Sequence, residues 1–439
     1  MEQWDAIVVG AGPSGTLVAE CLLNRGLSVL VLDGGPRPGT DGTIPEVDEK
    51  AWKFETPALP CDWLRVRAVG GASLAWGGWS NRFPNSVLLR GGWPCDADEL
   101  APFYTQVERR IEVVDTPLLP RHRQLADSLG LTVLPMRCSR MPGSPWRASS
   151  SPVSKSVRAD TIVTRIHHDA RGSALEVTAA NGSTSSLSAR AVVLAASPVE
   201  TTRLLLASGA GELCPRIGCG LTYHPVVGYA LIEAGSGDET STCGALVVAG
   251  DHCNGLLGPD FSVEITGPHR FAALASELRQ RIRPQGELPP DPQVTFIHTM
   301  GELKPSPARR VDLSPTTRDT LGRAVPRIHL AWSDAELAWI ADMQRAAISI
   351  AEALAPKGGT LVEYSDPICA PILFHEAGTC SMGTSIEAPC DPWGRLNALR
   401  NVWVADASVF PSAGDRHPTL TILAFASRAA NSAAQWLGA

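Results

Sequence analysis

Three glycines near the N-terminus have the spacing of a turn that binds a dinucleotide. Gly10, Gly12 and Gly15 form the pattern G-x-G-x-x-G between an apolar run at residues 6–9 and a helix-like stretch at residues 16–23. The first glycine permits a tight turn, the second lets the backbone approach a pyrophosphate, and the third lets the helix pack on the strand. Backbone N–H groups at the start of the helix then face the phosphates. Because the strand and the helix are both present, dinucleotide binding is favoured over an ordinary glycine-rich turn.

A carboxylate follows this turn where the ribose of an adenosine would lie. A second apolar strand is expected at residues 27–32, and it ends in Asp33. An acidic side chain at this position accepts hydrogen bonds from ribose hydroxyl groups and disfavours NADP. Ser14, inside the glycine turn, joins these candidate cofactor-binding residues. FAD and NAD use the same turn, so these residues alone leave the cofactor open.

Histidines are the side chains best suited to acid–base chemistry near neutral pH. The chain has ten, but none of them form an HxxxH or HxxH pair, so we expect no metal site. His375 and His417 lie in the C-terminal third. Taken alone, each is more readily a structural residue than a catalytic one.

Composition narrows the class of protein. The charged fraction of 19% and the formal net charge of -7 argue against binding to nucleic acid, which normally requires a basic excess. The eleven cysteines include no CxxC pair, which is typical of reduced thiols and predicts a cytoplasmic enzyme. Only residues 1–5 precede the first apolar strand, and no apolar run reaches the roughly 18 residues that would span a bilayer. We therefore expect neither a signal peptide nor a membrane span.

At 439 residues the chain exceeds the usual size of one hydrophobic core, so we expect two domains that are interleaved in sequence. The predicted fold class is α/β, with a Rossmann-type dinucleotide-binding domain and an α+β substrate domain that contains an antiparallel sheet. Residues 116–154 are rich in proline, arginine and serine and are expected to be irregular. The predicted boundaries are 1–94, 155–225 and 366–439 for the dinucleotide-binding domain, 95–154 for a lid or connection, and 226–365 for the substrate domain.

Hydrophobic periodicity predicts the elements that must position the candidate residues. Strands are expected at residues 159–166, 174–178, 191–195, 294–299, 327–331 and 402–405, and helices from about Val199, Ser333 and Pro418. A second glycine cluster, RAVGGASLAWGG at residues 67–78, is expected in a loop. Its bare backbone would let a planar ligand approach closely, and a structural turn is an equal alternative.

Together, these segments resemble the glucose-methanol-choline (GMC) family of flavin oxidoreductases over nearly the whole chain. The C-terminal motifs are the most specific: FHEAGTCSMG at residues 374–383 is similar to the family's catalytic-histidine motif, and NVWVADAS at 401–408 with HPTLT at 417–421 resembles its closing signature. Further similar segments are residues 10–15 with Asp33, 69–78, 93–94 with 100–104, 193–206, 224–225, and Glu302 with 310–311.

The resemblance implies FAD as the cofactor and an alcohol as the substrate. It implies that Val163 contributes main-chain contact near the adenine and that Asp406 and Ala407 lie along the ribityl chain or the pyrophosphate. Gly71, Ser73, Pro418 and Thr419 complete the candidate cofactor-binding residues. Members with covalently attached flavin have a histidine four residues after the second glycine of the Gly70-Gly71 pair, whereas this chain has Ala75, so we expect non-covalent FAD. The chain is also short for the family in its substrate domain and lid.

The resemblance places His375 and His417 at the two positions that face the flavin. Alcohol oxidation needs a base that removes the hydroxyl proton while a hydride passes to flavin N5. We assign the base role to His375 and orientation of the oxygen to His417, although the two roles can be reversed because coupled imidazoles titrate as a pair. The dipole of the helix from Pro418 would stabilise negative charge on reduced flavin. His224 matches a family position that is usually structural.

The predicted function is oxidation of an alcohol on a polyol, a sugar-like molecule or a natural-product intermediate. A flavin-bound lyase on the same scaffold, an NAD(P)H-dependent flavin monooxygenase and a catalytically inert binding protein are the alternatives. The sequence leaves open the alcohol, the electron acceptor and the oligomeric state.

Overall fold

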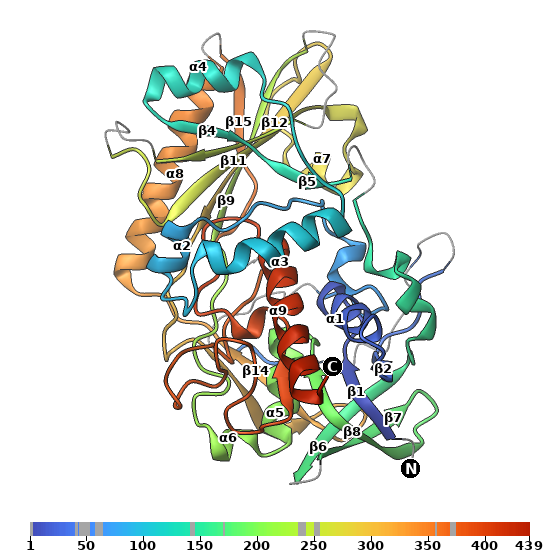
Figure 1. Ribbon diagram of the computed structural model, residues 1–439. Helices are drawn as coiled ribbons and strands as arrows, with labels where there is room; N and C mark the ends of the chain where they lie inside the picture. The colour runs from blue at the N-terminus through green and yellow to red at the C-terminus, as the bar shows by residue number, and fades with distance from the viewer. Residues whose placement is uncertain are drawn as a thin grey trace.

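The computed structural model describes residues 3–39, 43, 53–57, 65–140, 145–169, 172–235, 243–249, 255–355, 358–368 and 375–439. Two parts lie one above the other in Figure 1, each built on its own sheet, and both ends of the described chain lie in the lower part. The predicted class, a Rossmann-type α/β unit interleaved with an α+β part that contains an antiparallel sheet, is confirmed.

The lower sheet has six strands: β1 (Gln3–Val9), β2 (Val29–Leu32), β6 (Thr161–Asp169), β7 (Gly172–Ala179), β8 (Thr184–Leu194) and β16 (Val402–Val404). β1 lies between β2 and β8, and β16 also pairs with β8, all in parallel. β6 and β7 continue the sheet as antiparallel strands. Residues 6–9 are buried, as expected for a central parallel strand that is covered on both faces.

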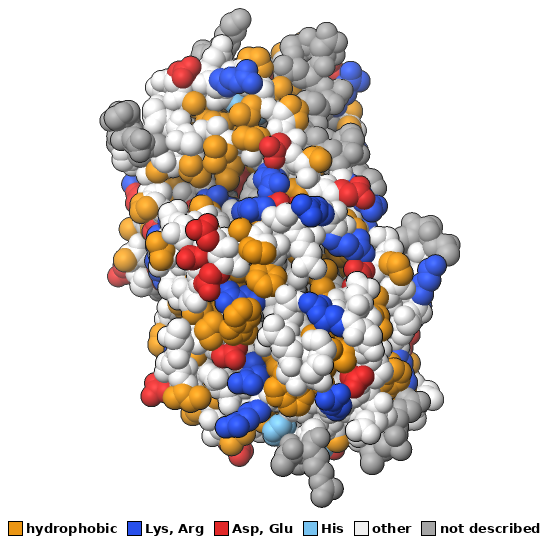
Figure 2. Space-filling view, in the orientation of Figure 1, with side chains coloured by type: hydrophobic (Ala, Val, Ile, Leu, Met, Phe, Trp, Pro, Cys, Tyr) orange, Lys and Arg blue, Asp and Glu red, His pale blue; other side chains and the backbone are white. Residues whose placement is uncertain are grey.

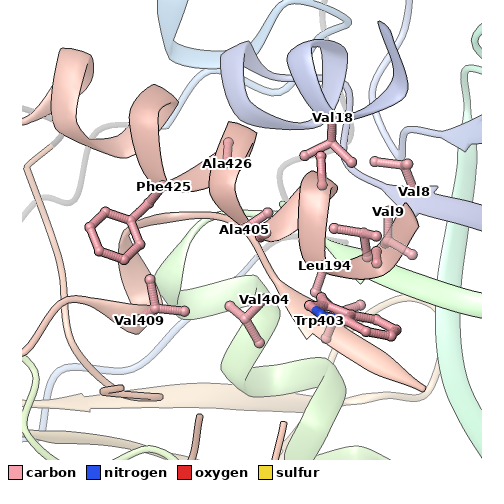
Figure 3. Packing of buried hydrophobic residues seen from close by; sticks show 14 of the residues in the cluster. Val8, Val9, Val18, Leu194, Trp403, Val404, Ala405, Val409, Phe425 and Ala426 are labelled. Carbon is pink, nitrogen blue, oxygen red and sulfur yellow. The ribbon is translucent and has the colours of Figure 1, made fainter. Parts of the chain in front are cut away.

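Five helices of the described chain belong to this part: α1 (Pro13–Leu23), α3 (Ala97–Arg110), α5 (Pro198–Ala207), α6 (Ala210–Leu213) and α9 (Thr419–Leu437). α9 packs against α1 and α3. Figure 3 shows Val8, Val18, Leu194, Trp403 and Phe425 from five different elements meeting in one core. Each such apolar side chain contributes about 1.5–3 kcal/mol when fully buried. The core thus fixes the starts of α1 and α9 relative to the ends of the parallel strands.

The upper sheet is antiparallel, with the strand order β15-β9-β12-β11-β10-β4. Its strands are β4 (Thr132–Pro135), β9 (Val226–Ala234), β10 (Gly244–Val248), β11 (Phe261–Arg270), β12 (Pro292–Gly301) and β15 (Thr360–Glu363). The long helix α8 (Asp334–Leu354) packs on β9 and β12. It begins at a capping box in which the Ser333 hydroxyl accepts from the Glu336 N–H and the Glu336 carboxylate accepts from the Ser333 N–H.

The remaining elements are shorter. They are η2 (Gly71–Leu74), α2 (Asn85–Arg90), β3 (Val113–Asp115), α4 (Pro120–Leu129), β5 (Arg137–Ser139), η3 (Ala148–Ser150), η4 (Pro152–Ser156), η5 (Phe271–Ala273), α7 (Ser276–Arg281), β13 (Arg310–Arg318), β14 (Ala324–His329) and η6 (Ala407–Val409). β13 and β14 form a hairpin, and β3 pairs with β5.

The expectation of irregular structure at residues 116–154 was wrong for three segments, of which the short strand β5 is one. Pro120–Leu129 is the helix α4, which packs on α8, and Thr132–Pro135 is the edge strand β4, which pairs with β10. Proline at the first position of α4 is compatible with a helix start, so it marks the boundary of the helix. The predicted lid therefore contributes α3 to the lower core and α4 to the upper core. The domain boundaries themselves remain proposals.

The described surface and thiols agree with an ordinary globular enzyme. Basic and acidic side chains are interspersed on the face shown in Figure 2. The eight described cysteines are free thiols, and seven of them are buried. No helix among the described residues has the length and apolar character needed to cross a membrane.

Candidate active site

A cavity of about 420 Å³ lies where the two glycine clusters, the end of β2 and the start of α9 come together. It brings together nine of the twelve predicted cofactor-binding residues: Gly10, Gly12, Ser14, Asp33, Gly71, Val163, Asp406, Ala407 and Thr419. These residues come from segments more than 400 positions apart in the sequence. Their assembly around one cavity is the arrangement that a bound dinucleotide requires.

The glycines of the two clusters are needed for close backbone approach. Gly10 has φ +101°, and a Cβ there would lie 2.4 Å from the carbonyl oxygen of Ala195. Gly71 has φ +51°, and its Cβ would lie 3.0 Å from the Cα of Gly12. Side chains at these positions would push the two backbone segments apart, so the glycine clusters form the walls of one narrow cradle.

The Asp33 carboxylate joins the two turns beside the cradle. Its Oδ2 accepts a hydrogen bond from the Ala11 N–H at 2.7 Å, and its Oδ1 accepts one from the Gly35 N–H at 2.8 Å. Burial raises the pKa of Asp33, and the two backbone N–H groups oppose that rise. Each oxygen keeps a second lone pair, so the side chain can still accept from a ribose hydroxyl.

Asp406 and the start of α9 form the opposite side of the cavity. Asp406 Oδ1 accepts from the Ser408 N–H at 2.9 Å, and Oδ2 accepts from the Thr201 hydroxyl at 2.7 Å. Thr419, the first residue of the 19-residue helix α9, lines the cavity. The positive end of this helix dipole therefore faces the cavity, where it favours negative charge.

Three predicted cofactor-binding residues lie outside the cavity lining. A Cβ on Gly15 would lie 1.9 Å from the Gly10 carbonyl oxygen, so this glycine lets α1 pack on the turn, as expected. The Ser73 hydroxyl donates to the Gly70 carbonyl at 2.6 Å and accepts from the Ala148 N–H at 2.9 Å. Pro418 is the N-cap residue of α9. All three shape the segments that form the cavity.

Sequence reasoning missed a charged group in the cavity wall. Arg65 and Glu200 both line it, and Arg65 Nη1 donates to Glu200 Oε1 at 2.6 Å. Burial would raise the pKa of Glu200, but the charges of Arg65 and Arg203 outweigh burial and lower it. The Nε and Nη2 atoms of Arg65 are buried without a hydrogen-bond partner among the described residues. An anionic phosphate would satisfy such donors, so the wall fits the pyrophosphate of FAD.

The two predicted catalytic histidines are in direct contact. His375 Nε2 and His417 Nδ1 lie 3.2 Å apart, and the two rings are nearly perpendicular, at 89°. Neither side chain lines the cavity, whereas Glu376, which follows His375, and Thr419, two residues after His417, do. The pair therefore borders the end of the cavity at which α9 begins.

Two further residues extend this pair into a chain of four side chains. His224 Nδ1 lies 2.9 Å from His375 Nδ1, and His417 Nε2 lies 2.8 Å from Glu264 Oε2. Glu264 was missed because it stands between Val263 and Ile265 in strand β11, and a lone carboxylate flanked by β-branched apolar residues is the signal that could have found it. His224 was interpreted as structural, and the structure places it against the predicted base.

Burial controls the protonation of this chain. It lowers the pKa of His375 well below its ordinary value of 6.5, and the neighbouring His417 and His224 lower it further. Burial likewise lowers the pKa of His224 to about 4. Both rings are therefore neutral at physiological pH, which is the state that a general base needs.

Comparisons with known proteins agree with this geometry. Two family models, both described as GMC oxidoreductase, match residues 145–226 and 305–426, and a model described as an NAD(P)-binding Rossmann-like domain matches residues 8–59. An uncharacterized GMC-type oxidoreductase of Mycobacterium tuberculosis is 29% identical, covering 96% of this chain and 74% of the relative.

Two relatives carry more specific names. The fructose dehydrogenase large subunit of Gluconobacter japonicus is 23% identical, covering 97% of each chain. Paromamine 6'-oxidase of Streptomyces fradiae is 25% identical, covering 98% of this chain and 91% of the relative. The crystal structure of pyridoxine 4-oxidase from Mesorbium loti shares the fold, with a TM-score of 0.71 at 19% identity over 98% of this chain and 99% of that one.

The glycine clusters form a cradle for a dinucleotide, and a buried histidine pair lies at the end of that cavity. Together these two features define a flavin-dependent oxidoreductase. The chain belongs to the GMC oxidoreductase family. It is accordingly an FAD-dependent enzyme that oxidises alcohol groups.

Proposed function

We propose that this enzyme oxidises an alcohol of a polyol, a sugar-like molecule or a natural-product intermediate to a carbonyl, with His375 as the base. One observation carries the proposal: the facing nitrogens of His375 and His417 lie 3.2 Å apart at the end of the cofactor cavity. A substrate hydroxyl held against both nitrogens would be oriented by one ring while the other takes its proton.

The protein's own groups would handle the proton. His375 Nε2 would accept it from the hydroxyl, and His417 Nδ1 would hold the oxygen in place. The Glu264 carboxylate, bound to His417 Nε2, would offset the positive charge that the pair gains. FAD, when bound, supplies the oxidation by accepting the hydride.

The named relatives support a sugar-like substrate. One is named for fructose and another for paromamine, and each matches nearly the whole of this chain. Since both matches lie near 25% identity, we propose the substrate class and no single substrate.

Ala75 supports the proposal that FAD is bound without a covalent bond. It follows η2, at the position where members with covalently attached flavin carry a histidine. A methyl side chain has no atom that can form such a bond. We therefore propose that the cradle and the polar groups of the cavity hold the cofactor.

Anaerobic reduction of the FAD-loaded protein tests the proposed function. The flavin absorbance would be followed while D-fructose, paromamine and a panel of polyols are added, and again with NADPH. Bleaching by an alcohol is the expected result. Bleaching by NADPH alone would contradict the proposal and favour a monooxygenase, whereas consumption of an alcohol with the flavin remaining oxidised would favour a lyase.

A further inference from the structure

We propose that Arg90 is a positioning residue of this site, which binds the segment that carries His417 to the sheet that carries Glu264. This inference rests on the proposed function, in which His417 orients the substrate oxygen. Arg90 lies outside the motif segments of the sequence and does not line the cofactor cavity. Its effect on the reaction is therefore exerted through another side chain.

His417 and Glu264 belong to different parts of the molecule. Glu264 stands in β11 of the upper sheet, whereas His417 stands two residues before α9 of the lower part. His417 Nε2 lies 2.8 Å from Glu264 Oε2, and His417 Nδ1 lies 3.2 Å from His375 Nε2. Both distances therefore depend on how the start of α9 is held against the upper sheet.

One face of β11 holds the segment that precedes α9, residues 412–417. The Ser262 hydroxyl donates to the Asp415 carbonyl, and Glu264 contacts His417. Residues two apart in a strand point to the same face of a sheet. The same face of β11 thus contacts two alternate residues of the segment.

Arg90, the last residue of α2, holds the segment from a second side. Its Nη2 donates to Asp415 Oδ2 at 3.3 Å, and its Nε donates to Glu302 Oε2 at 2.5 Å. Glu302 directly follows β12, the neighbour of β11, and its other oxygen accepts from the Ser412 hydroxyl. Arg90 and Glu302 therefore tie two residues of the segment to the end of the upper sheet.

Burial makes the Arg90 guanidinium necessary at this place. The side chains of Glu302 and Asp415 are 0% and 5% exposed. A carboxylate buried so deeply needs a cation or several donors beside it, because an isolated buried charge is strongly unfavourable. Asp415 has a second cation, since Arg416 Nε donates to its Oδ1 at 2.7 Å. Among the described residues, Arg90 is the cation that contacts Glu302.

Two glycines show how closely the region around α2 packs on the segment. A Cβ on Gly91, the residue after Arg90, would lie 2.5 Å from the Ser412 Oγ. A Cβ on Gly414, at φ +73°, would lie 2.6 Å from the Phe83 ring. The two stretches of chain are therefore in direct contact, and a change in one displaces the other.

Loss of the Arg90 guanidinium should reach the reaction through His417. A buried carboxylate that loses its cation takes up a proton or draws in water, and in both cases the hydrogen bonds that fix residues 412–417 change. A displacement of about 1 Å in a group that orients the substrate costs about 10²-fold in rate. Arg90 thus contributes by holding His417 at the distances on which the site depends.

The first test requires no substrate. Crystal structures of the FAD-loaded wild type, Arg90→Gln and Arg90→Lys would give the distance between His375 Nε2 and His417 Nδ1. In Arg90→Gln we expect residues 412–417 to be displaced and this distance to exceed hydrogen-bonding range. Lysine keeps the charge but lacks the planar fork of donors, so Arg90→Lys should show a smaller displacement, and it serves as the test if Arg90→Gln does not fold. An unchanged segment in every variant that folds would overturn the inference.

The second test asks whether Arg90 acts through His417, with D-fructose and paromamine as the probes. We expect Arg90→Gln to lower kcat about 10²-fold with little change in KM, and Arg90→Lys to recover part of the rate. In the His417→Ala background the same Arg90→Gln change should cause no further loss, because the side chain that Arg90 positions is absent. A full further loss in that background, or an effect confined to KM, would contradict a positioning role.

Arg110 provides a matched control. Its guanidinium donates to both carboxylate oxygens of Glu20, at 2.9 and 2.7 Å, and this ion pair joins α3 to α1. Its side chain is 31% exposed, compared with 20% for Arg90. Arg110→Gln should lose stability while kcat and the distance between the two histidines stay unchanged. A fall in kcat equal to that of Arg90→Gln would mean that the loss of any ion pair disturbs the site, which would overturn the inference.

The inference and the proposed function fail separately. If the distance responds as expected but no alcohol reduces the flavin, the proposed function fails and the assignment of Arg90 to the His417 segment still stands. If an alcohol reduces the wild-type flavin while Arg90→Gln keeps both the distance and the rate, the inference fails and the proposed function still stands.

Discussion

His375 Nε2 and His417 Nδ1 lie 3.2 Å apart. The other nitrogen of each ring contacts a second buried side chain. Behind His375 lies the neutral ring of His224, and behind His417 lies the Glu264 carboxylate. The two nitrogens are thereby fixed at a distance that one hydroxyl oxygen can span. The predictions below follow from this contact and from the cavity beside it.

Loss of either ring should affect chemistry more than cofactor binding. His375→Gln and His417→Ala remove the base and the orienting group, so we expect kcat to fall about 10²- to 10⁴-fold. Neither side chain lines the cavity, so the FAD content should match that of the wild type. The ratio of flavin to protein absorbance, measured beside kcat, checks both statements. A variant that has lost its flavin, or one that retains full activity, would argue against these roles.

The pH dependence should reflect the lowered pKa of the base. Burial and the neighbouring rings lower the pKa of His375 well below 6.5, so the ring stays unprotonated as the pH falls through 6.5. A lowered pKa moves the acid limb of the profile to lower pH, because a base acts only in its unprotonated form. We expect kcat/KM to stay level through pH 6.5 and to fall only in more acidic solution. A midpoint at or above pH 6.5 would show that another group controls the rate.

FAD should dissociate from the denatured protein. Ala75 stands where a covalently attached flavin would need a histidine. After acid precipitation, the yellow colour should therefore remain in the supernatant, which an absorbance spectrum of both fractions will show. Colour in the pellet would mean that another residue forms a covalent bond.

Close approach of the two glycine clusters can be tested with one methyl group. Gly71→Ala adds a Cβ only 3.0 Å from the Gly12 Cα at φ +51°, whereas Gly26→Ala adds one at φ +78° with nothing within 4 Å. Both variants carry backbone strain of about 1–3 kcal/mol, but only the first narrows the cradle. We expect FAD to bind at least about tenfold more weakly, or 1.4 kcal/mol, to Gly71→Ala than to Gly26→Ala. Fluorescence titration of the apoproteins gives both affinities, and equal values would mean that the cradle does not hold the cofactor.

The residues that sequence reasoning identified most securely are those whose roles are set locally. Gly10 and Gly15 act within one strand, turn and helix, so their spacing alone indicates the turn. Asp33 closes the next strand, and its backbone bonds are formed within that same unit. His375 and His417 needed the family resemblance, because nothing local to either residue shows that they meet.

The contacts that sequence reasoning did not predict depend on tertiary pairing. His224 reaches His375 through the Thr222–Ala377 bridge, and Glu264 reaches His417 from a strand of the other sheet. Neither contact leaves a periodic pattern in the sequence. The helix α4 was missed for a different reason: its proline and arginines read as a loop, yet proline at the first turn and an apolar residue at Leu125 are enough for a helix that packs on α8.

Hydride transfer from an alcohol carbon is the central claim, and an isotope effect tests it most directly. The rate of flavin bleaching would be measured by anaerobic rapid mixing with an alcohol that reduces the enzyme, carrying either hydrogen or deuterium on the carbon to be oxidised. We expect the deuterated alcohol to reduce the flavin several-fold more slowly, in the wild type and in the slower His375→Gln variant. Equal rates for the two alcohols in the slow variant, where chemistry must limit the reaction, would contradict the proposed oxidation.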